Sequence, residues 1–221
     1  MIKLNDNRKY FFKKGSHTTR AEFPVIEEVV GQNKEIIDLG CGDGSLMQIL
    51  AKNKNECQGV EVSESGVEVC KGKGLKVVQG RIDTRLPYKD KKFDIAVCNV
   101  TIHMTTYPEV LFEEMLRISK NQIITFPNFA FVLNRLHLMF LGIFPRWSLF
   151  GYKWYSTGHI HQLSIKDFEQ FCKERNVKIV GRHHLFPKPI RNSLQKLPII
   201  GLLLNRSANL LATMAIFETK S

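Results

Sequence analysis

Residues 38–45 read DLGCGDGS and combine the residue types that hold a nucleoside. They follow an apolar run and precede an amphipathic segment, which predicts a strand, a tight turn and a helix. Gly40, Gly42 and Gly44 permit positive φ angles and let the backbone pass close to a ligand. The first N–H groups of the following helix have no partner within the helix, so they point at the turn. The segment is therefore a candidate binding loop.

A carboxylate at the end of the next predicted strand extends this pattern. Glu61 lies near the end of the strand-like run at residues 57–62. A carboxylate in that place can accept hydrogen bonds from both hydroxyls of a ribose. The glycine spacing is G-x-G-x-G, whereas the dinucleotide fingerprint is G-x-G-x-x-G. An NAD site and a merely tight turn are the two alternative interpretations.

The Asp-x-Gly-x-Gly-x-Gly form resembles motif I of class I S-adenosylmethionine (SAM) methyltransferases. The resemblance implies that the turn surrounds the methionine and ribose portion of SAM and that Glu61 holds the ribose. SAM would then be the cofactor and S-adenosylhomocysteine (SAH) the product.

Strands that alternate with helices predict an α/β fold of the Rossmann-like, doubly wound kind, with a mostly parallel seven-stranded sheet. We expect one domain over residues 1–221, with an N-terminal helical segment at 1–32 and a lid or acceptor insertion at 129–163 after the fifth strand. The expected strands are 35–39, 57–62, 75–79, 93–99, 122–126, 177–184 and 210–219, and the expected helices are 10–30, 46–54, 65–71, 108–119 and 164–175.

The carboxyl ends of parallel strands meet at one edge of such a sheet, where ligands bind. We therefore expect the residues that follow these strands to form the cofactor site. The candidates are Asp38, Gly40, Cys41, Gly42, Gly44, Glu61, Val62, Arg81, Ile82, Asp83, Asn99, Val100 and His103.

Short motifs in the second half of the chain narrow the resemblance. They are 78–80 (VQG), 125–129 (TFPNF), 154–157 (WYST), 160–161 (IH), 167–168 (DF) and 208–212 (ANLLA). Together they resemble the MetW (methionine biosynthesis protein W) family. That resemblance implies the class I methyltransferase fold and a link to methionine biosynthesis through partnership with a homoserine O-acyltransferase. It leaves the methyl acceptor open.

Two positions depart from the family pattern. Arg81 stands where the family usually has the Asp that holds the adenine amino group, so Asp83 or the backbone around Ile82 would take over that contact. Gly158-His159 stands where the family tends to have Pro-Asn. Both changes concern substrate identity more than SAM binding.

Methyl transfer from SAM is an in-line displacement, so much of the catalysis can come from alignment. A base is needed only if the acceptor must lose a proton. His103, after the fourth strand, has a suitable ordinary pKa, and a wall residue is the alternative interpretation. Asn128, after the fifth strand, would line the acceptor side, and a local turn cap is the alternative.

The insertion carries the candidate acceptor residues Trp154, Tyr155, His159 and His161. Aromatic faces could flank a sulfonium by cation–π attraction. The alternative is an aromatic cluster that only packs the insertion onto the sheet. No carboxylates complete a metal site with the two histidines, so we expect no metal.

The formal charge of +11 favours an anionic partner, but the lysines are dispersed and no RNA-binding motif is present, so we do not expect nucleic acid. The five cysteines are odd in number and scattered, as expected of reduced thiols, and no signal peptide is apparent. Both features predict a cytoplasmic protein. The apolar run at 197–204 leaves a lipid-like acceptor and a peripheral membrane contact open. Two main hypotheses follow: a SAM-dependent methyltransferase acting on a small-molecule or lipid-like acceptor, or a SAM- or SAH-binding accessory protein that regulates a homoserine O-acyltransferase. A third, a nucleic-acid methyltransferase, is suggested by the net charge alone.

Overall fold

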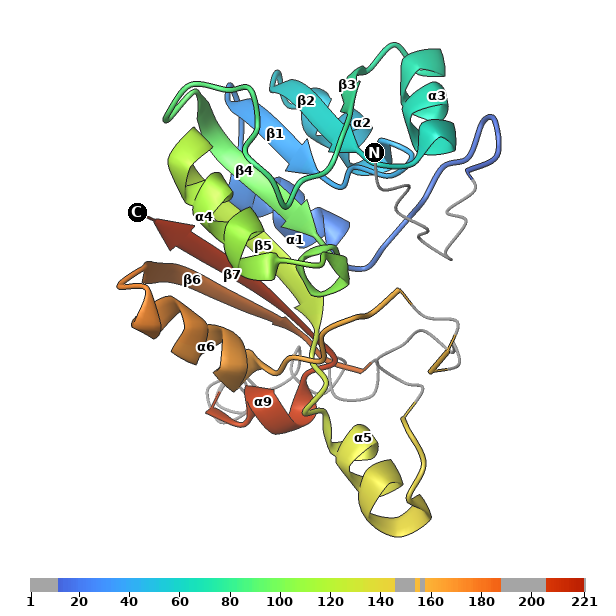
Figure 1. Ribbon diagram of the computed structural model, residues 1–221, viewed down its shortest axis with the longest axis vertical. Coiled ribbons are helices and arrows are strands. Elements are labelled where there is room, and N and C mark those ends of the chain that lie inside the picture. The colour runs from blue at the N-terminus through green and yellow to red at the C-terminus, as the bar shows by residue number, and fades with distance from the viewer. Residues whose placement is uncertain (1–11, 146–153, 156–157, 188–205, 221) are drawn as a thin grey trace.

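A seven-stranded sheet of order β3-β2-β1-β4-β5-β7-β6 forms the centre of the protein in this computed structural model (Figure 1). The structure describes residues 12–145, 154–155, 158–187 and 206–220. The first five strands are parallel, whereas β7 runs antiparallel between β5 and β6. The strands are β1 Glu35–Leu39, β2 Glu56–Glu61, β3 Lys76–Gln79, β4 Phe93–Asn99, β5 Ser119–Pro127, β6 Lys178–Leu185 and β7 Met214–Lys220. The predicted fold class is confirmed.

Helices cover both faces of the sheet (Figure 1). On one face, α1 and α2 bury Phe23, Ile26 and Leu50 against β1 and β4. On the other, α4 and α6 pack Phe112 and Phe168 against β5 and β7. The helices are α1 Phe23–Val30, α2 Ser45–Ala51, α3 Glu64–Gly72, η1 Ile102–Met104, α4 Pro108–Ile118, α5 Val132–Leu136, η2 His137–Leu141, α6 Ile165–Glu174 and α9 Ala208–Leu211.

The strand order changes direction at β1, which has β2 on one side and β4 on the other. In open α/β sheets a ligand site forms outside the carboxyl ends of the strands at this switch point. The turn after β1 and the loop after β4 therefore face the same space. The fold brings the two halves of the predicted site together.

Two predicted elements differ most in extent from the structure. The helix expected at 10–30 exists only as α1, Phe23–Val30. Residues 10 and 11, the first two of the expected helix, lie outside the described residues. Gly15, at φ +77°, lies in a turn, and the other residues of 12–20, the segment called the strap below, have no regular secondary structure. The strand expected at 210–219 begins at Met214, because α9 occupies its first residues. The apolar run at 197–204 lies outside the described residues.

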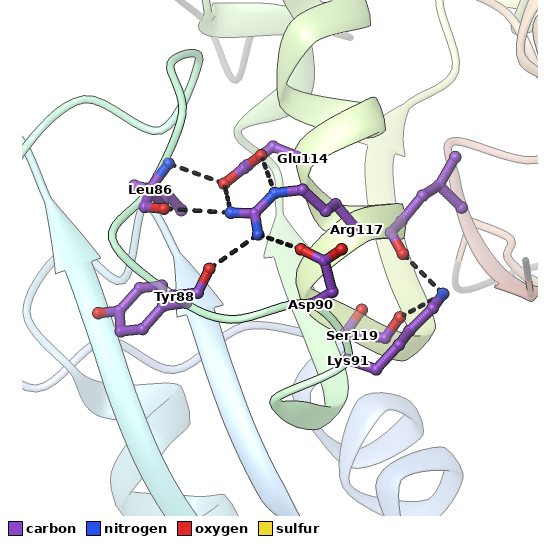
Figure 2. Close-up of polar contacts among 8 residues, drawn as sticks. Leu86, Tyr88, Asp90, Lys91, Glu114, Arg117 and Ser119 are labelled. Carbon is purple, nitrogen blue, oxygen red and sulfur yellow. Dashed lines mark hydrogen bonds and ion pairs between the residues drawn. The ribbon is translucent and has the colours of Figure 1, made fainter.

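Arg117, near the end of α4, fixes the loop that leads from β3 into β4 (Figure 2). Its guanidinium donates to the carbonyl oxygens of Leu86 at 3.1 Å and Tyr88 at 2.7 Å. It also contacts the carboxylates of Glu114 and Asp90. Glu114 in turn accepts the N–H of Leu86 at 2.7 Å. The network holds the loop just downstream of the residues that follow β3.

Replacing Arg117 by alanine is expected to lower the free energy of unfolding by about 2–4 kcal/mol, because it leaves the buried Glu114 carboxylate without its cation. Chemical denaturation measures this change. The matched control is Lys120→Ala, which removes an exposed ion pair with Asp94 and should leave the midpoint almost unchanged. Equal midpoints for both variants would contradict the proposed anchoring role.

Candidate cofactor site

A cavity of about 590 Å³ opens at the carboxyl ends of β1, β2 and β4. This volume is in the range of small-molecule and cofactor sites. Eleven of the predicted cofactor residues line it: Asp38, Gly40, Cys41, Gly42, Glu61, Val62, Arg81, Ile82, Asp83, Asn99 and Val100. Gly44 and His103 do not. The spacing of motifs along the chain therefore predicted half of the 22 residues that line this cavity.

The glycine turn adopts a backbone that larger residues could not. Gly40 has φ +82°, and a Cβ there would lie 2.6 Å from Cγ2 of Thr101. Gly44 has φ +72°, and its Cβ would lie 2.4 Å from Cδ1 of Leu75. Gly44 therefore does not line the cavity, and its missing side chain lets the turn pack against neighbouring side chains. The turn is held close to the loop after β4 and to the chain before β3.

Gly66, in α3, supports the same turn and was not among the predicted residues. A Cβ on Gly66 would lie 2.9 Å from the carbonyl oxygen of Gly42 and 2.9 Å from Cγ of Glu61. Sequence spacing could not predict this role, because a glycine inside a helix indicates only a lower helix propensity. The side-chain hydrogen of this residue allows the glycine turn and Glu61 to approach the helix.

Glu61, at the end of β2, is 6% exposed and joins the turn to the start of α3. One of its oxygens accepts the N–H of Gly42 at 2.8 Å, and the other accepts the N–H of Ser63 at 2.8 Å. Burial raises the pKa of Glu61, although these N–H groups act in the opposite direction. A carboxylate offers about four lone-pair sites, so each oxygen can still accept a ligand hydroxyl.

Asp38, at the end of β1, is the most perturbed acid of the site. It is 2% exposed, and its Oδ1 atom has no hydrogen-bond partner among the described residues. Burial, and secondly the charge of Glu61, raise the pKa of Asp38 to about 7. A buried carboxylate oxygen without a partner is costly, and a cation that enters the cavity would relieve that cost.

Arg81 and Asp83 form an ion pair with two hydrogen bonds, of 3.0 Å and 2.6 Å, at the wall that follows β3. Asp83 is 5% exposed and also accepts the N–H groups of Thr106 and Tyr107. Arg81 therefore neutralises Asp83, and the pair ties the loop after η1 to this wall. Arg81, which stands where the family usually has Asp, is therefore paired with Asp83 within the site.

The strap at residues 12–20 closes over the glycine turn and contributes Phe12, Thr18 and Arg20 to the cavity lining. Thr18 donates from its hydroxyl to Asp43 at 2.9 Å and from its N–H to the hydroxyl of Ser45 at 2.8 Å. Phe12 and Thr18 were missed by the sequence analysis. No motif marks them, since their partners lie in a different part of the chain.

His103 does not lie where the sequence predicted. It is 1% exposed, does not line the main cavity, and its ring nitrogens have no hydrogen-bond partner among the described residues. The ring packs edge-on against His159 with centroids 4.3 Å apart. Burial, with His159 and His161 adding to the effect, holds the pKa of His103 well below its usual value. The 3₁₀ turn η1 directs this side chain toward the insertion, while Thr101 and Met104 line the cavity.

Asn128 is also placed outside the cavity lining. Its side chain is fully buried and donates to the carbonyl oxygens of Asn209 at 3.1 Å and Ala212 at 2.9 Å. Its Oδ1 atom accepts the N–H of Ala130 at 3.2 Å. The amide therefore locks the end of β5 to α9, as in the alternative interpretation of a turn cap.

The four candidate acceptor residues separate into two pairs, and none lines the main cavity. His159 and His161 lie beside η1, where the N–H groups of Ile160 and His161 both donate to the carbonyl oxygen of His103 at 3.0 Å. Trp154 and Tyr155 are 72% and 63% exposed and contact each other edge-on. Of the described residues, no group of three His, Cys, Asp or Glu side chains could hold a metal ion. No helix among the described residues has the length and hydropathy to cross a membrane.

The sheet order and the cavity at its switch point define the fold class of the SAM-dependent methyltransferases. The fold matches a SAM-dependent methyltransferase of Thermotoga maritima, described as a possible histamine N-methyltransferase, over 90% of this chain and 87% of that one, with a TM-score of 0.61 and 18% identity. It also matches geranyl diphosphate C-methyltransferase of Streptomyces coelicolor A3(2), solved with Mg²⁺, geranyl diphosphate and SAH, over 90% and 77% of the chains, with a TM-score of 0.60 and 13% identity. These likenesses concern the fold.

The chain belongs to the MetW family, because the model of that family, "Methionine biosynthesis protein MetW", matches residues 20–217. The bifunctional methionine biosynthesis protein MetXA/MetW of Rhodopirellula baltica is 27% identical over 173 residues, or 73% of this chain. The chain spans 28% of the length of that relative. The family resemblance carried by the short motifs is confirmed.

Proposed function

We propose that this protein binds SAM and transfers its methyl group to a small-molecule or lipid-like acceptor, with SAH as the product. The observation that carries the proposal is the pair of buried carboxylates, Asp38 and Glu61, at the tips of neighbouring strands in one cavity. SAM brings a sulfonium and an ammonium group, which suit a negative cavity. The anionic pyrophosphate of NAD would lie at the glycine turn and meet the carboxylate of Asp38 unfavourably, which argues against the alternative cofactor.

The roles follow from the positions of the side chains around the turn. Glu61 accepts the ribose hydroxyls, and the unpartnered oxygen of Asp38 faces the positively charged methionine portion. The backbone at Ile82, beside the Arg81–Asp83 pair, is proposed to receive the adenine. Because the donor is already activated, positioning supplies most of the proposed catalysis.

A second candidate function is regulation of a homoserine O-acyltransferase by a SAM- or SAH-bound accessory protein. The observation that favours it is the relative from Rhodopirellula baltica, in which a MetW part and a MetXA part share one chain. This candidate uses the same cofactor site. It differs in requiring no methyl acceptor. Both candidates are proposed to operate in the cytoplasm.

Isothermal titration calorimetry with SAM, SAH and NAD tests the cofactor first. We expect binding of SAM and SAH but not of NAD. The absence of heat with both SAM and SAH, from protein shown to be folded by circular dichroism, would contradict the proposal. Transfer of a labelled methyl group to metabolite or lipid pools supports the enzyme, whereas binding without transfer and co-purification with an acyltransferase support the regulatory role.

A further inference from the structure

An exposed apolar tip projects from the insertion after β5. It consists of Leu138, Met139, Phe140, Leu141 and Ile143, which are 44%, 68%, 71%, 58% and 51% exposed. Figure 1 shows α5 and the following turn extending beyond the sheet, at the end of the molecule where α9 lies. Contiguous exposed apolar side chains mark an interaction surface.

The base of this projection is firmly anchored. Phe131 and Asn134 are 5% and 0% exposed, and the Asn134 amide donates to the carbonyl oxygen of Phe129 at 3.0 Å. Arg135 donates to the carbonyl oxygen of Ala130 at 2.6 Å. The apolar tip is therefore displayed by a stem that is anchored to the preceding loop.

The arrangement of the tip favours a fluid apolar medium over a protein partner. Leu138, Met139, Phe140 and Leu141 are consecutive within a helical turn, so their side chains point to different sides of it. A partner with one flat face would bury only some of them. An amphipathic or apolar helix that enters the acyl boundary of a bilayer is surrounded on all sides.

The distribution of charged residues along the chain favours an anionic lipid surface over a neutral one. The sequence has no Asp or Glu between Glu114 and Asp167, nor between Glu174 and Glu218. The first stretch contains the tip and the second contains α9, and both elements lie at the same end of the molecule (Figure 1). Basic residues such as Arg135 and Arg206 in these stretches are exposed. An anionic lipid surface would meet no acidic side chain from either stretch.

We propose that this protein docks on anionic lipid bilayers by inserting the tip at Leu138–Ile143, with exposed basic side chains such as Arg135 and Arg206 providing electrostatic attraction. The inference concerns the surface alone and does not depend on methyl transfer. The area of contact is the headgroup boundary, as for other peripheral anchors that combine apolar side chains with basic ones.

Co-sedimentation with vesicles tests the proposal. We expect the full-length protein to bind vesicles of equal parts phosphatidylglycerol and phosphatidylcholine, to bind phosphatidylcholine alone weakly, and to be released by high salt. The double variant Met139→Asp/Phe140→Asp should weaken binding by about tenfold or more, because two charges must enter the apolar boundary. The control Val180→Asp adds a charge at a 48% exposed apolar residue of β6 and should bind like the wild type.

Several outcomes would overturn the proposal. They are no binding of the wild type to anionic vesicles, equal binding to both kinds of vesicle, and unchanged binding of the double variant. A dimer in light scattering that the double variant abolishes, without vesicle binding, would assign the tip to a second copy of the chain instead. Circular dichroism and SAM calorimetry on each variant separate a loss of docking from a loss of folding or of the cofactor site.

Discussion

Replacing Glu61 by alanine is expected to weaken SAM binding by about 100-fold, which corresponds to about 2.7 kcal/mol. The wild-type carboxylate accepts the N–H groups of Gly42 and Ser63, so it both shapes the glycine turn and presents its remaining lone pairs to the ribose. A charge-assisted hydrogen bond contributes roughly 1.5–3 kcal/mol, so the expected loss of affinity corresponds to one or two such contacts with the ribose. Calorimetry measures the change directly.

Two further variants separate the binding role from the structural one. Glu61→Gln keeps the shape and one acceptor oxygen but loses the charge, so it should retain the fold and bind SAM with intermediate affinity. Glu68→Ala removes an exposed carboxylate from α3, the helix that follows Glu61, and should bind like the wild type. Wild-type affinity in Glu61→Ala would refute the assignment of the ribose contact, whatever the effect on stability.

Local patterns predicted the elements that position this site. The bounds of β1, Glu35–Leu39, and of β4, Phe93–Asn99, agree with the sequence prediction, because each is an apolar run flanked by polar turn residues. The capping box of α6 at Ser164 and Asp167 also formed as its residue types indicate. The glycine turn and Glu61 could be predicted because their chemistry is tied to strand ends.

The errors arise where contacts between distant segments decide. Asn128 was correctly placed at the end of β5, but its amide is bound by carbonyl oxygens of Asn209 and Ala212, far along the chain. His103 was correctly placed after β4, but the 3₁₀ turn rotates it away from the cavity. Thr18 lies outside a helix because its hydroxyl donates to Asp43 and its backbone N–H donates to the hydroxyl of Ser45, both in the segment of the glycine turn. Spacing along a sequence gives the strand end but not the side-chain direction.

SAM affinity is expected to rise as the pH increases toward 7 and to level off above it. In the free protein, burial and Glu61 raise the pKa of Asp38 to about 7, so the carboxyl is largely protonated below that pH. A cationic ligand prefers the ionised form, so binding must displace the proton. In that range the affinity should increase by up to about tenfold per pH unit.

Calorimetry in buffers of different ionisation enthalpy measures this proton release. Below pH 7 we expect up to one proton released per SAM bound, and a smaller release with SAH, which lacks the sulfonium charge. Asp38→Asn should remove the Asp38 contribution to the pH dependence and bind SAM more weakly at pH 8. A pH profile identical to that of the wild type in Asp38→Asn would exclude Asp38 as the titrating group.

The same ionisation should have the opposite effect on the stability of the free protein. The folded-state pKa of Asp38 lies above its ordinary value of 3.8, so the unfolded state releases this proton first as the pH rises. The stabilising contribution is present below pH 3.8 and is lost as the pH increases through about 7. Thermal unfolding at pH 8 should therefore show Asp38→Asn to be more stable than the wild type without ligand, while the added stability from SAM is larger in the wild type. The Asp38 carboxylate is therefore expected to destabilise the ligand-free protein and to stabilise the complex with SAM, as a ligand-binding residue does.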